Sequence, residues 1–493
     1  LAAIDRQDVA VWAGNPPGTG FHCSTQTRSG CVGNGKHRSD NRSRLEQGVL
    51  TMASALHAGA AAIDITPKDS QFLYGYPHVE RYSTGVHDPL SSSALYLSDG
   101  QTQVMFITND VIFISRDISH RVRARIQEAT GIPAGNIMVT ATHTHSGPVI
   151  ADLLSTEGDP VVPKADRKYL QFLEEGITKA AVKAYESALP TKIGFGITRA
   201  NGIGTNRRDP DGPADLDVPV LVVNSAEQNN IIALMLVCCM HPTVLHEDST
   251  LISGDFPAMA RQYLQEKVLG ESCPVLYHTG PEGNQSPRHV TKGNTFDEAV
   301  RLGTMLAQAV ESILPTLQYR ETISLTALQR FVELVPGEFP TVKQAEKKLR
   351  VAVDKLKTLR EHHASSAQIR TAECDWFGAE ETVTLTKAAR DGRLAEVQKQ
   401  VMPAEIQVFR VGEWNFVAWP GEMFIEYGLA VKQKYQNTFV IALANGELQG
   451  YIVTPEAAAE GGYEASNALF AAQSGQLLVD TTVNMLNELK NRL

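Results

Sequence analysis

The chain has 493 residues, of which 43% are hydrophobic and 20% charged, so most of it is expected to fold as a globular protein with a sizeable core. The net charge of −10 argues against nucleic acid or an anionic membrane as the main partner. No stretch approaches the roughly 18 consecutive apolar residues that cross a bilayer, so no transmembrane segment is expected.

The first fifty residues differ in composition from the rest of the chain. Residues 14–43 are rich in Gly, Ser, Asn, Thr and Arg and contain almost no aliphatic residues, so they cannot contribute to a core. Residues 1–51 are therefore predicted to be a disordered or artificially added extension, and residues 52–493 the folded catalytic domain. The N-terminus also lacks the basic-then-apolar order of a secretory signal, so a cytoplasmic location is expected.

From residue 58 to about residue 330, β-type runs alternate with amphipathic helical runs. The predicted strands are Ala58–Ile65, Val104–Ile107, Val111–Ile114, Asn136–Thr142, Val218–Val223, Ile231–Cys239 and Val275–His278. The predicted helices are Asp117–Ala129, Asp166–Ala188, Ala258–Leu269 and Asp297–Leu314. This alternation predicts an α/β layered enzyme.

Residues 340–400 have a different pattern. The stretch Val342–His363 has apolar residues at helical spacing with Lys and Glu between them, which predicts a solvated helical hairpin laid over the core. Strands are predicted again at Ile406–Val411 and Phe416–Ala418, and a last helix at Gln476–Leu489. No internal repeat and no separate C-terminal domain are visible.

The cysteines do not suggest a scaffold. The chain contains no CxxC pair, so neither a zinc ribbon nor a disulfide framework is indicated. The six are Cys23, Cys31, Cys238, Cys239, Cys273 and Cys374.

The sharpest chemical motif is Ala141-Thr-His-Thr-His-Ser-Gly-Pro148. If the strand that starts near Ile137 continues, His143 and His145 project from one face at its end, which is a natural start for a zinc site. Two ordinary hydrogen-bonded histidines fit the same short motif.

A second histidine, His241, follows the buried-looking strand Ile231–Cys239, and strand ends are where α/β sheets carry functional groups. His246 and His278 are similar candidates, and nothing in the spacing separates the three.

Two further segments have the composition of ligand-binding turns. Gly280-Pro-Glu-Gly-Asn-Gln-Ser-Pro-Arg288 is a tight polar loop that would present the Ser286 hydroxyl, although it also reads as a surface turn and is not a GxSxG elbow. In Trp419-Pro-Gly-Glu-Met423, a turn presents Glu422 as a metal ligand or as a cap of the following helix. The glycine-rich stretch that follows carries Tyr451 and Tyr463 and can approach a ligand closely.

Taken together, these segments resemble the neutral (non-lysosomal) ceramidase family. The resemblance covers roughly residues 58–485. It rests on motifs that occur in the same order, namely Ala62-Ile-Asp-Ile-Thr-Pro67, Gly85-Val-His-Asp-Pro89, Thr142-His-Thr-His-Ser-Gly-Pro148, His241-Pro-Thr243, Asp255-Phe256, Ser286-Pro287, Pro420-Gly-Glu422 and the tyrosine pair.

The resemblance implies a mixed-sheet layered α/β catalytic domain that binds Zn²⁺, with a set of site residues. Its metal ligands would be His143, His241, Glu422 and Tyr451. Around the scissile carbonyl it implies His145, Arg207 and Tyr463, with Arg208 as the neighbouring alternative to Arg207. Ser286 corresponds to the serine regarded as essential in that family, as nucleophile or as positioning hydroxyl.

The chain departs from the family pattern at three points. The serine loop reads Gly283-Asn-Gln-Ser-Pro-Arg288, where the usual form has Asp after the Gly and Asn after the Pro. The helical segment at about 340–400 is an insertion without a counterpart, and no immunoglobulin-like C-terminal domain is expected. These differences bear on ceramide as the substrate more than on the zinc site.

The predicted function is zinc-dependent hydrolysis of an N-acyl amide bond in a small molecule by a metal-activated water. One alternative is a serine hydrolase or esterase that uses Ser286 and has only a structural metal. Another is a ligand-binding relative without catalysis. His, Glu and Tyr ligands also accept manganese, iron or cobalt, and the oligomeric state is not encoded in any motif.

Overall fold

The computed structural model describes residues 56–491, apart from the side chains of residues 366 and 367, so the predicted extension 1–51 lies outside the described residues. Its largest sheet has nine strands in the order β11-β9-β8-β6-β1-β3-β4-β5, with β13 also paired to β6. Their bounds are β1 His57–Asp64, β3 Ser91–Ser98, β4 Gln103–Asn109, β5 Ile137–Ala141, β6 Leu189–Arg199, β8 Asp217–Ser225, β9 Ile231–Cys238, β11 Val275–Thr279 and β13 Tyr319–Arg320.

A second sheet has the order β14-β15-β16-β18. Its strands are β14 Leu325–Val332, β15 Ala404–Val411, β16 Trp414–Ala418 and β18 Thr438–Ile441. Three two-stranded pairs complete the β-structure: β2 Gly85–Val86 with β10 Leu251–Ile252, β7 Thr205–Asn206 with β12 Gln285–Ser286, and β17 Glu422–Met423 with β19 Tyr451–Ile452. Parallel and antiparallel pairs occur in both large sheets, so the prediction of a mixed-sheet α/β fold is confirmed.

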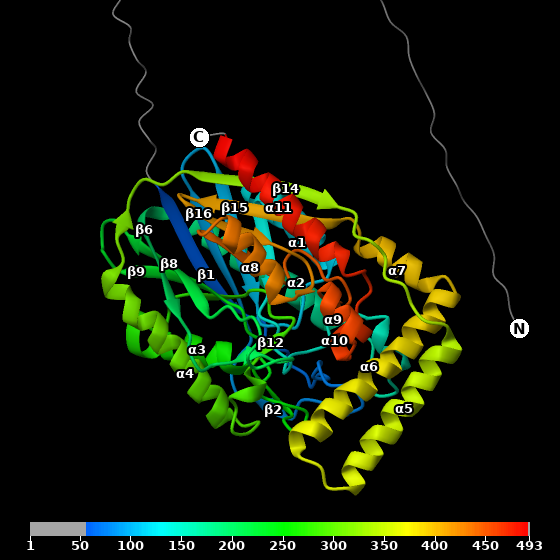
Figure 1. The fold of residues 1–493 in the computed structure, drawn as a ribbon. Coiled ribbons are helices and arrows are strands. Elements are labelled where there is room, and N and C mark those ends of the chain that lie inside the picture. Colours follow the sequence, from blue (N-terminus) through cyan, green and yellow to red (C-terminus); the bar gives the residue numbers. More distant parts are fainter. Residues whose placement is uncertain (1–55, 492–493) are drawn as a thin grey trace, which may run out of the picture. The chain divides into compact units, whose positions relative to one another are not determined.

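Helices cover the outer faces of the two sheets (Figure 1). Helices α1 to α4 pack on the nine-stranded sheet, and α8 and α11 on the second sheet. The helices are α1 Arg116–Thr130, α2 Arg167–Glu186, α3 Asp255–Leu264, α4 Phe296–Ile313, α5 Val342–Glu361, α6 Ser366–Arg390, α7 Arg393–Val401, α8 Ile425–Lys434, α9 Pro455–Glu460, α10 Tyr463–Ser466 and α11 Gln473–Asn491. Within the described residues, no helix combines the length and the apolar character that crossing a bilayer requires.

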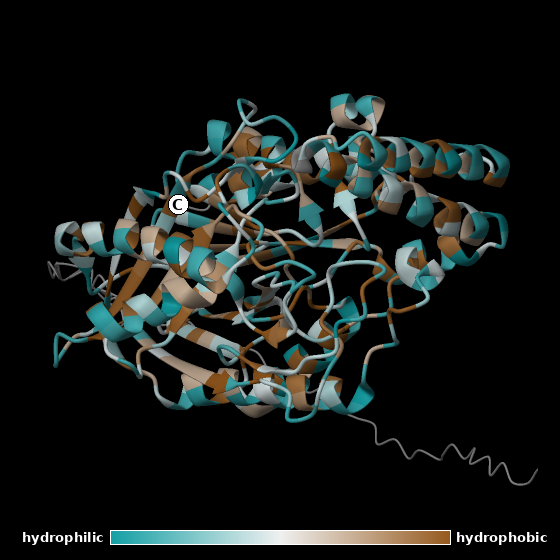
Figure 2. Cartoon of the chain, turned by 90° about the horizontal axis from the view of Figure 1, so that it is seen from below, coloured by the Kyte–Doolittle hydropathy of each residue, from teal (hydrophilic) through white to brown (hydrophobic). Residues whose placement is uncertain are grey.

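The two sheets and the helices on their outer faces form four layers. The core between the layers is built by side chains that alternate along the strands. In β3, Leu95 and Leu97 pack against the second sheet, whereas Ala94 and Tyr96 pack against the helices on the other face. The strands β8 and β9 divide their side chains in the same way. Because neighbouring residues of a strand point to opposite faces, a strand buried on both sides is apolar throughout, and Figure 2 shows such apolar strands between helices with polar outer faces.

The nine-stranded sheet curls until its two edges meet. Thr108 Oγ1 on β4 donates to Tyr277 O on β11 at 2.6 Å, and Thr279 Oγ1 donates to Thr142 O, beyond β5, at 2.8 Å. The carboxyl ends of the parallel pairs β4–β5 and β9–β11 therefore lie next to each other. This meeting of strand ends positions the candidate site.

The secondary structure differs from the prediction in one segment and agrees with it over residues 340–400. The predicted strand Val111–Ile114 is wrong: β4 ends at Asn109, and this segment is a loop whose carbonyl groups, Val111 O and Ile112 O, bond to His143. The helices predicted over residues 340–400 are confirmed as α5, α6 and α7, and α5 and α6 each begin with a capping box.

Candidate metal centre

His143 lies just beyond the end of β5 in an unusual backbone conformation. The strand ends at Ala141 and His143 has φ = 70°, so the strand does not continue through the two histidines and the condition for a shared strand face is not met. A positive φ is sparsely populated for a residue with a side chain, and such strain is found most often at functional sites. The His143 Nδ1 atom lies 2.7 Å from Ile112 O, which directs Nε2 towards the other candidate ligands.

His145 nevertheless reaches the same point. Its Nε2 lies 3.3 Å from His143 Nε2, and its Nδ1 lies 3.2 Å from Gly75 O. Gly75 has φ = 123°, and a Cβ there would lie 2.4 Å from His145 Nδ1, so only glycine lets the loop approach this ring. Burial lowers the pKa of His145 well below its usual value, which keeps the imidazole neutral.

His241 completes the histidine cluster from the end of β9. Its Nδ1 lies 2.9 Å from Glu282 O, and its Nε2 lies 3.1 Å from His143 Nε2. Burial, followed by the nearby Arg207, lowers the pKa of His241 to about 4. It is therefore neutral at pH 7, the form that binds a metal.

Glu422 faces both histidines. Its Oε2 lies 3.2 Å from His241 Nε2 and 3.5 Å from His143 Nε2. Burial alone would raise the pKa of this carboxyl, but the adjacent imidazoles outweigh it and hold the pKa well below the usual value. Glu422 follows a turn in which Gly421 has φ = 81°, a conformation suited to glycine.

The donor set itself indicates a cation. Because both histidines donate from Nδ1 to a backbone carbonyl, their neutral forms carry a lone pair on Nε2. These lone pairs and the Glu422 carboxylate converge on one point, where a metal cation could accept all three. Two His and one carboxylate are a known catalytic zinc set, so the residues fit the metal.

Glu282 is a further candidate ligand that was not predicted from the sequence, where its loop was interpreted as presenting the Ser286 hydroxyl. The side chain is fully buried, and neither carboxylate oxygen has a hydrogen-bond partner. One of these oxygens belongs to a group of donor atoms, with those of His143, His241 and Glu422, that all lie within 4.8 Å of one another. The sequence feature that could have indicated Glu282 is its position shortly after strand β11, because His241 became a candidate from a similar position after a strand.

A glycine lets the Glu282 loop approach the Glu422 segment. A Cβ on Gly283 would lie 2.9 Å from backbone atoms of Met423, and Gly283 N donates to Met423 O at 2.8 Å. The next residue, Asn284, stands where the family pattern has Asp. It accepts from Ile425 N and donates to Glu426 Oε2, both at 2.8 Å, whereas an Asp there would place two carboxylates side by side.

Tyr451 lies next to Glu422 because β19 pairs in parallel with β17, with these two residues as register partners. The ring of Tyr463 lies 5.9 Å from that of Tyr451. Burial raises the pKa of both phenols well above the usual value, so both keep their proton. The predicted tyrosine pair is thus brought together beside the carboxylate.

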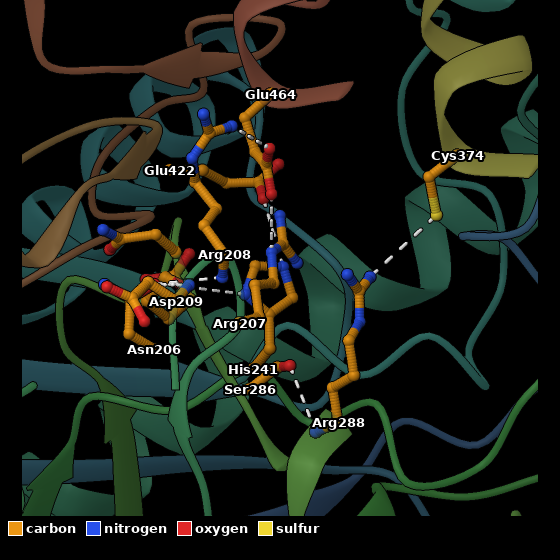
Figure 3. A network of polar contacts seen from close by, with 12 residues as sticks. Asn206, Arg207, Arg208, Asp209, His241, Ser286, Arg288, Cys374, Glu422 and Glu464 are labelled. Atoms are coloured by element: carbon orange, nitrogen blue, oxygen red, sulfur yellow. Dashed lines mark hydrogen bonds and ion pairs between the residues drawn. The ribbon is translucent and has the colours of Figure 1, made fainter. Parts of the chain in front are cut away.

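Arg207 and Arg208 take different positions, which Figure 3 shows around Glu464. Arg207 Nε donates to Glu464 Oε1 and Arg208 Nη1 to Glu464 Oε2, both at 2.9 Å. The Arg207 guanidinium lies 5.4 Å from the centre of the Tyr451 ring, and its buried Nη2 has no partner. Arg208 turns to Gly461 O, so Arg207 is the arginine at the candidate site.

Ser286 lies in β12, which pairs with β7. Its hydroxyl accepts from Arg288 N at 3.3 Å and caps the short helix that follows (Figure 3). The two other candidate histidines lie outside the cluster. The Nδ1 of His278 contacts Thr140 Oγ1 at 2.8 Å, and the ring of His246 lies against that of Tyr76.

A cavity of about 70 Å³ opens beside the cluster. Of the predicted site residues, those that line it are His143, His145, Glu422, Tyr451 and Tyr463. His241, Arg207 and Ser286 are not part of this lining.

Comparisons with known proteins agree on one family. Residues 56–275 match the sequence model described as "Neutral/alkaline non-lysosomal ceramidase, N-terminal". Neutral ceramidase A of Dictyostelium discoideum is 24% identical over 273 residues, which is 50% of this chain and 37% of that protein. Neutral ceramidase of Mycobacterium tuberculosis is 22% identical over 513 residues, 88% of this chain and 77% of that protein. The chain therefore spans little more than a third of the Dictyostelium relative and most of the mycobacterial one.

The fold matches a solved structure of the same kind. The crystal structure of neutral ceramidase from Pseudomonas aeruginosa superposes with a TM-score of 0.69 and 18% identity, over 89% of this chain and 75% of that one. At this identity the likeness shows that the two proteins share a fold.

Proposed function

Because this chain belongs to the neutral/alkaline non-lysosomal ceramidase family, we propose that it is a metal-dependent hydrolase that cleaves an N-acyl amide bond. The single observation that carries the proposal is the convergence of two imidazole nitrogens and a carboxylate, 3.1 to 3.5 Å apart, at the wall of a cavity. Such a group of donors is suited to bind a metal cation at its centre.

The residues that would hold the metal are His143, His241 and Glu422, with Glu282 and Tyr451 beside them. When bound, zinc lowers the pKa of a water to about 7 and polarises a carbonyl, which is the chemistry that amide hydrolysis needs. The carbonyl groups of Ile112 and Glu282 orient the two imidazoles, as outer partners of metal-bound histidines do.

His145 is suited to move the proton. Its Nδ1 faces Gly75 O, so the neutral ring carries its lone pair on Nε2, which lies beside the metal ligands. We assign two steps to His145: it accepts a proton from the attacking water and then donates this proton to the leaving amine.

Two donors can stabilise the negative charge that develops on the carbonyl oxygen. Tyr463 lines the cavity with a protonated phenol, and Arg207 has an unpartnered buried N–H over the Tyr451 ring. A well-placed donor contributes roughly 3–4 kcal/mol to such a transition state. Ser286 is not required for this scheme, since its hydroxyl caps a short helix.

The test combines metal content with turnover. Metal content by mass spectrometry and hydrolysis of a panel of N-acyl amides are measured for wild type and His143→Ala, with and without a chelator. We expect about one metal per chain in wild type, and loss of both metal and turnover in the variant. The control is His120→Ala, which removes an exposed histidine of α1. Full turnover in a metal-free protein would contradict the proposal.

A further inference from the structure

One buried carboxyl in the cavity comes from the helical segment that has no counterpart in the family pattern. Glu381 of α6 is 9% exposed, and its Oε2 is buried without a hydrogen-bond partner. It lines the same cavity as His143, Glu422 and Tyr463. The expectation of a hairpin that is merely solvated therefore leaves out the contribution of α6 to the candidate site.

The position of Glu381 is held by its neighbours on α6. His78 Nε2 lies 2.5 Å from Glu380 Oε2, and the His78 ring stacks on Trp376 with ring centres 4.9 Å apart. On the adjoining face, a Cβ on Gly158 would lie 2.4 Å from Thr384 Oγ1, so the loop and the helix are in close contact. A carboxyl on a helix packed this tightly is pre-organised for a ligand.

Glu381 is not placed to bind the metal. The carboxylates of Glu282 and Glu422 belong to the group of donors within 4.8 Å of one another, and that of Glu381 does not. Because Glu381 lines the cavity, it can contact a substrate bound there.

The charge of the cavity wall favours a cationic ligand. Among the described residues that line the cavity, the carboxyls besides the proposed metal ligand Glu422 are Glu381 and Glu447, and no lysine or arginine lines it. Asn467 forms a hydrogen bond with the Glu381 side chain, but the buried Oε2 has no partner. A bound ammonium group would supply that hydrogen bond and the opposite charge.

We propose that Glu381 binds a primary ammonium group of the substrate, so that the enzyme acts on N-acyl amides that carry a positive charge near the scissile bond. The inference rests on the proposed amide hydrolysis and adds the substrate class to it.

The experiment compares matched amides that differ in one group. In one series of amides, an ammonium group lies two carbons from the amide bond on the amine half. In a second series it lies two carbons from the amide bond on the acyl half. Each compound is compared with two analogues in which a hydroxyl or a methyl group replaces the ammonium group. We expect kcat/KM to favour one of the ammonium compounds, and Glu381→Gln to reduce that preference by about 10- to 100-fold. The variant should keep its metal, and its loss of kcat/KM should be larger for the ammonium compounds than for the neutral analogues. Glu396→Gln, which removes an exposed carboxylate of α7, is the control.

The outcomes separate this inference from the proposed function. Metal-dependent turnover of the neutral analogues without any ammonium preference would overturn the inference and leave amide hydrolysis in place. An equal loss for all compounds in Glu381→Gln would also overturn it, because that pattern indicates a structural role. If no compound is cleaved, the same comparison is made on dissociation constants by isothermal titration calorimetry, where equal values for ammonium and hydroxyl compounds overturn the inference.

Discussion

The Nε2 atoms of His143 and His241 lie 3.1 Å apart although ninety-eight positions separate the two residues in the chain. Each ring is oriented by a backbone carbonyl at its other nitrogen, Ile112 O for one and Glu282 O for the other. The loop after β4 and the loop after β11 thus fix the two imidazoles from opposite edges of the curled sheet. Changes in either loop are expected to affect metal binding without touching a ligand side chain.

Glu282→Gln is expected to weaken metal binding by about 10-fold or more, because it removes a buried carboxylate from the donor group of His143, His241 and Glu422. The measurement is the metal dissociation constant by competition with a chromophoric chelator. Glu396→Gln, the same change at an exposed position, should leave the constant unchanged. An unaltered affinity in Glu282→Gln would remove this residue from the metal site.

His145→Ala is expected to keep the metal and to lose turnover by roughly 10²- to 10⁴-fold, the usual contribution of a general acid–base group. The physical reason is that His143, His241 and Glu422 remain as two histidines and a carboxylate when His145 is removed, although His145 also lies within 4.8 Å of both histidines. Metal content and kcat are measured on the same preparation. Loss of metal in this variant would make His145 a ligand and not the proton carrier.

Ser286→Ala is expected to lower the free energy of unfolding by about 1 kcal/mol, since its hydroxyl caps a helical turn. Turnover should fall far less than in His143→Ala. Chemical denaturation measures the first effect, and steady-state kinetics the second. Covalent labelling of Ser286 by an organophosphate, with activity that survives a chelator, would instead establish the serine hydrolase alternative.

Arg123→Ala is expected to cost about 3–5 kcal/mol of stability, because it leaves the Glu405 carboxylate buried and unpaired. In the native protein Arg123 of α1 makes two hydrogen bonds of 2.8 Å to Glu405 of β15, and both side chains are buried. The matched control is Arg125→Ala, whose partly exposed pair with Glu174 should contribute less than about 1 kcal/mol. Urea unfolding of the two variants compares them, and a similar loss in both would contradict the argument.

His278 should make the protein less stable in mild acid. Burial lowers its pKa from 6.5 to about 3, so the unfolded chain binds a proton near pH 6.5 that the folded protein refuses. Its contribution is fully present above pH 6.5 and is lost as the pH falls towards 3, at up to about 1.4 kcal/mol per pH unit. Unfolding free energies measured from pH 7 to pH 4 should therefore fall less steeply in His278→Gln than in wild type. Parallel curves would show that His278 is not the group responsible.

Much of the fold could be predicted because its signals are local. The apolar runs around Val218–Val223 and Ile231–Cys239 are β8 and β9, and the helical spacing after Val342 is α5. The segment Val111–Ile114 was predicted wrongly for the same reason. Its apolar residues are buried as a strand's would be, but its carbonyl groups bond to His143 instead of to a neighbouring strand.

The sequence by itself determined which residues could bind a metal and where strands and helices alternate, because residue chemistry and side-chain periodicity are properties of short segments. The tertiary structure alone decided which of those residues meet. The curl of the sheet brings the ends of β5, β9 and β11 together, and this arrangement selected His241 over His278 and revealed Glu282. It also turned α6 so that Glu381 lines the cavity. Such choices depend on contacts between segments far apart in the chain, which no local pattern of residues encodes.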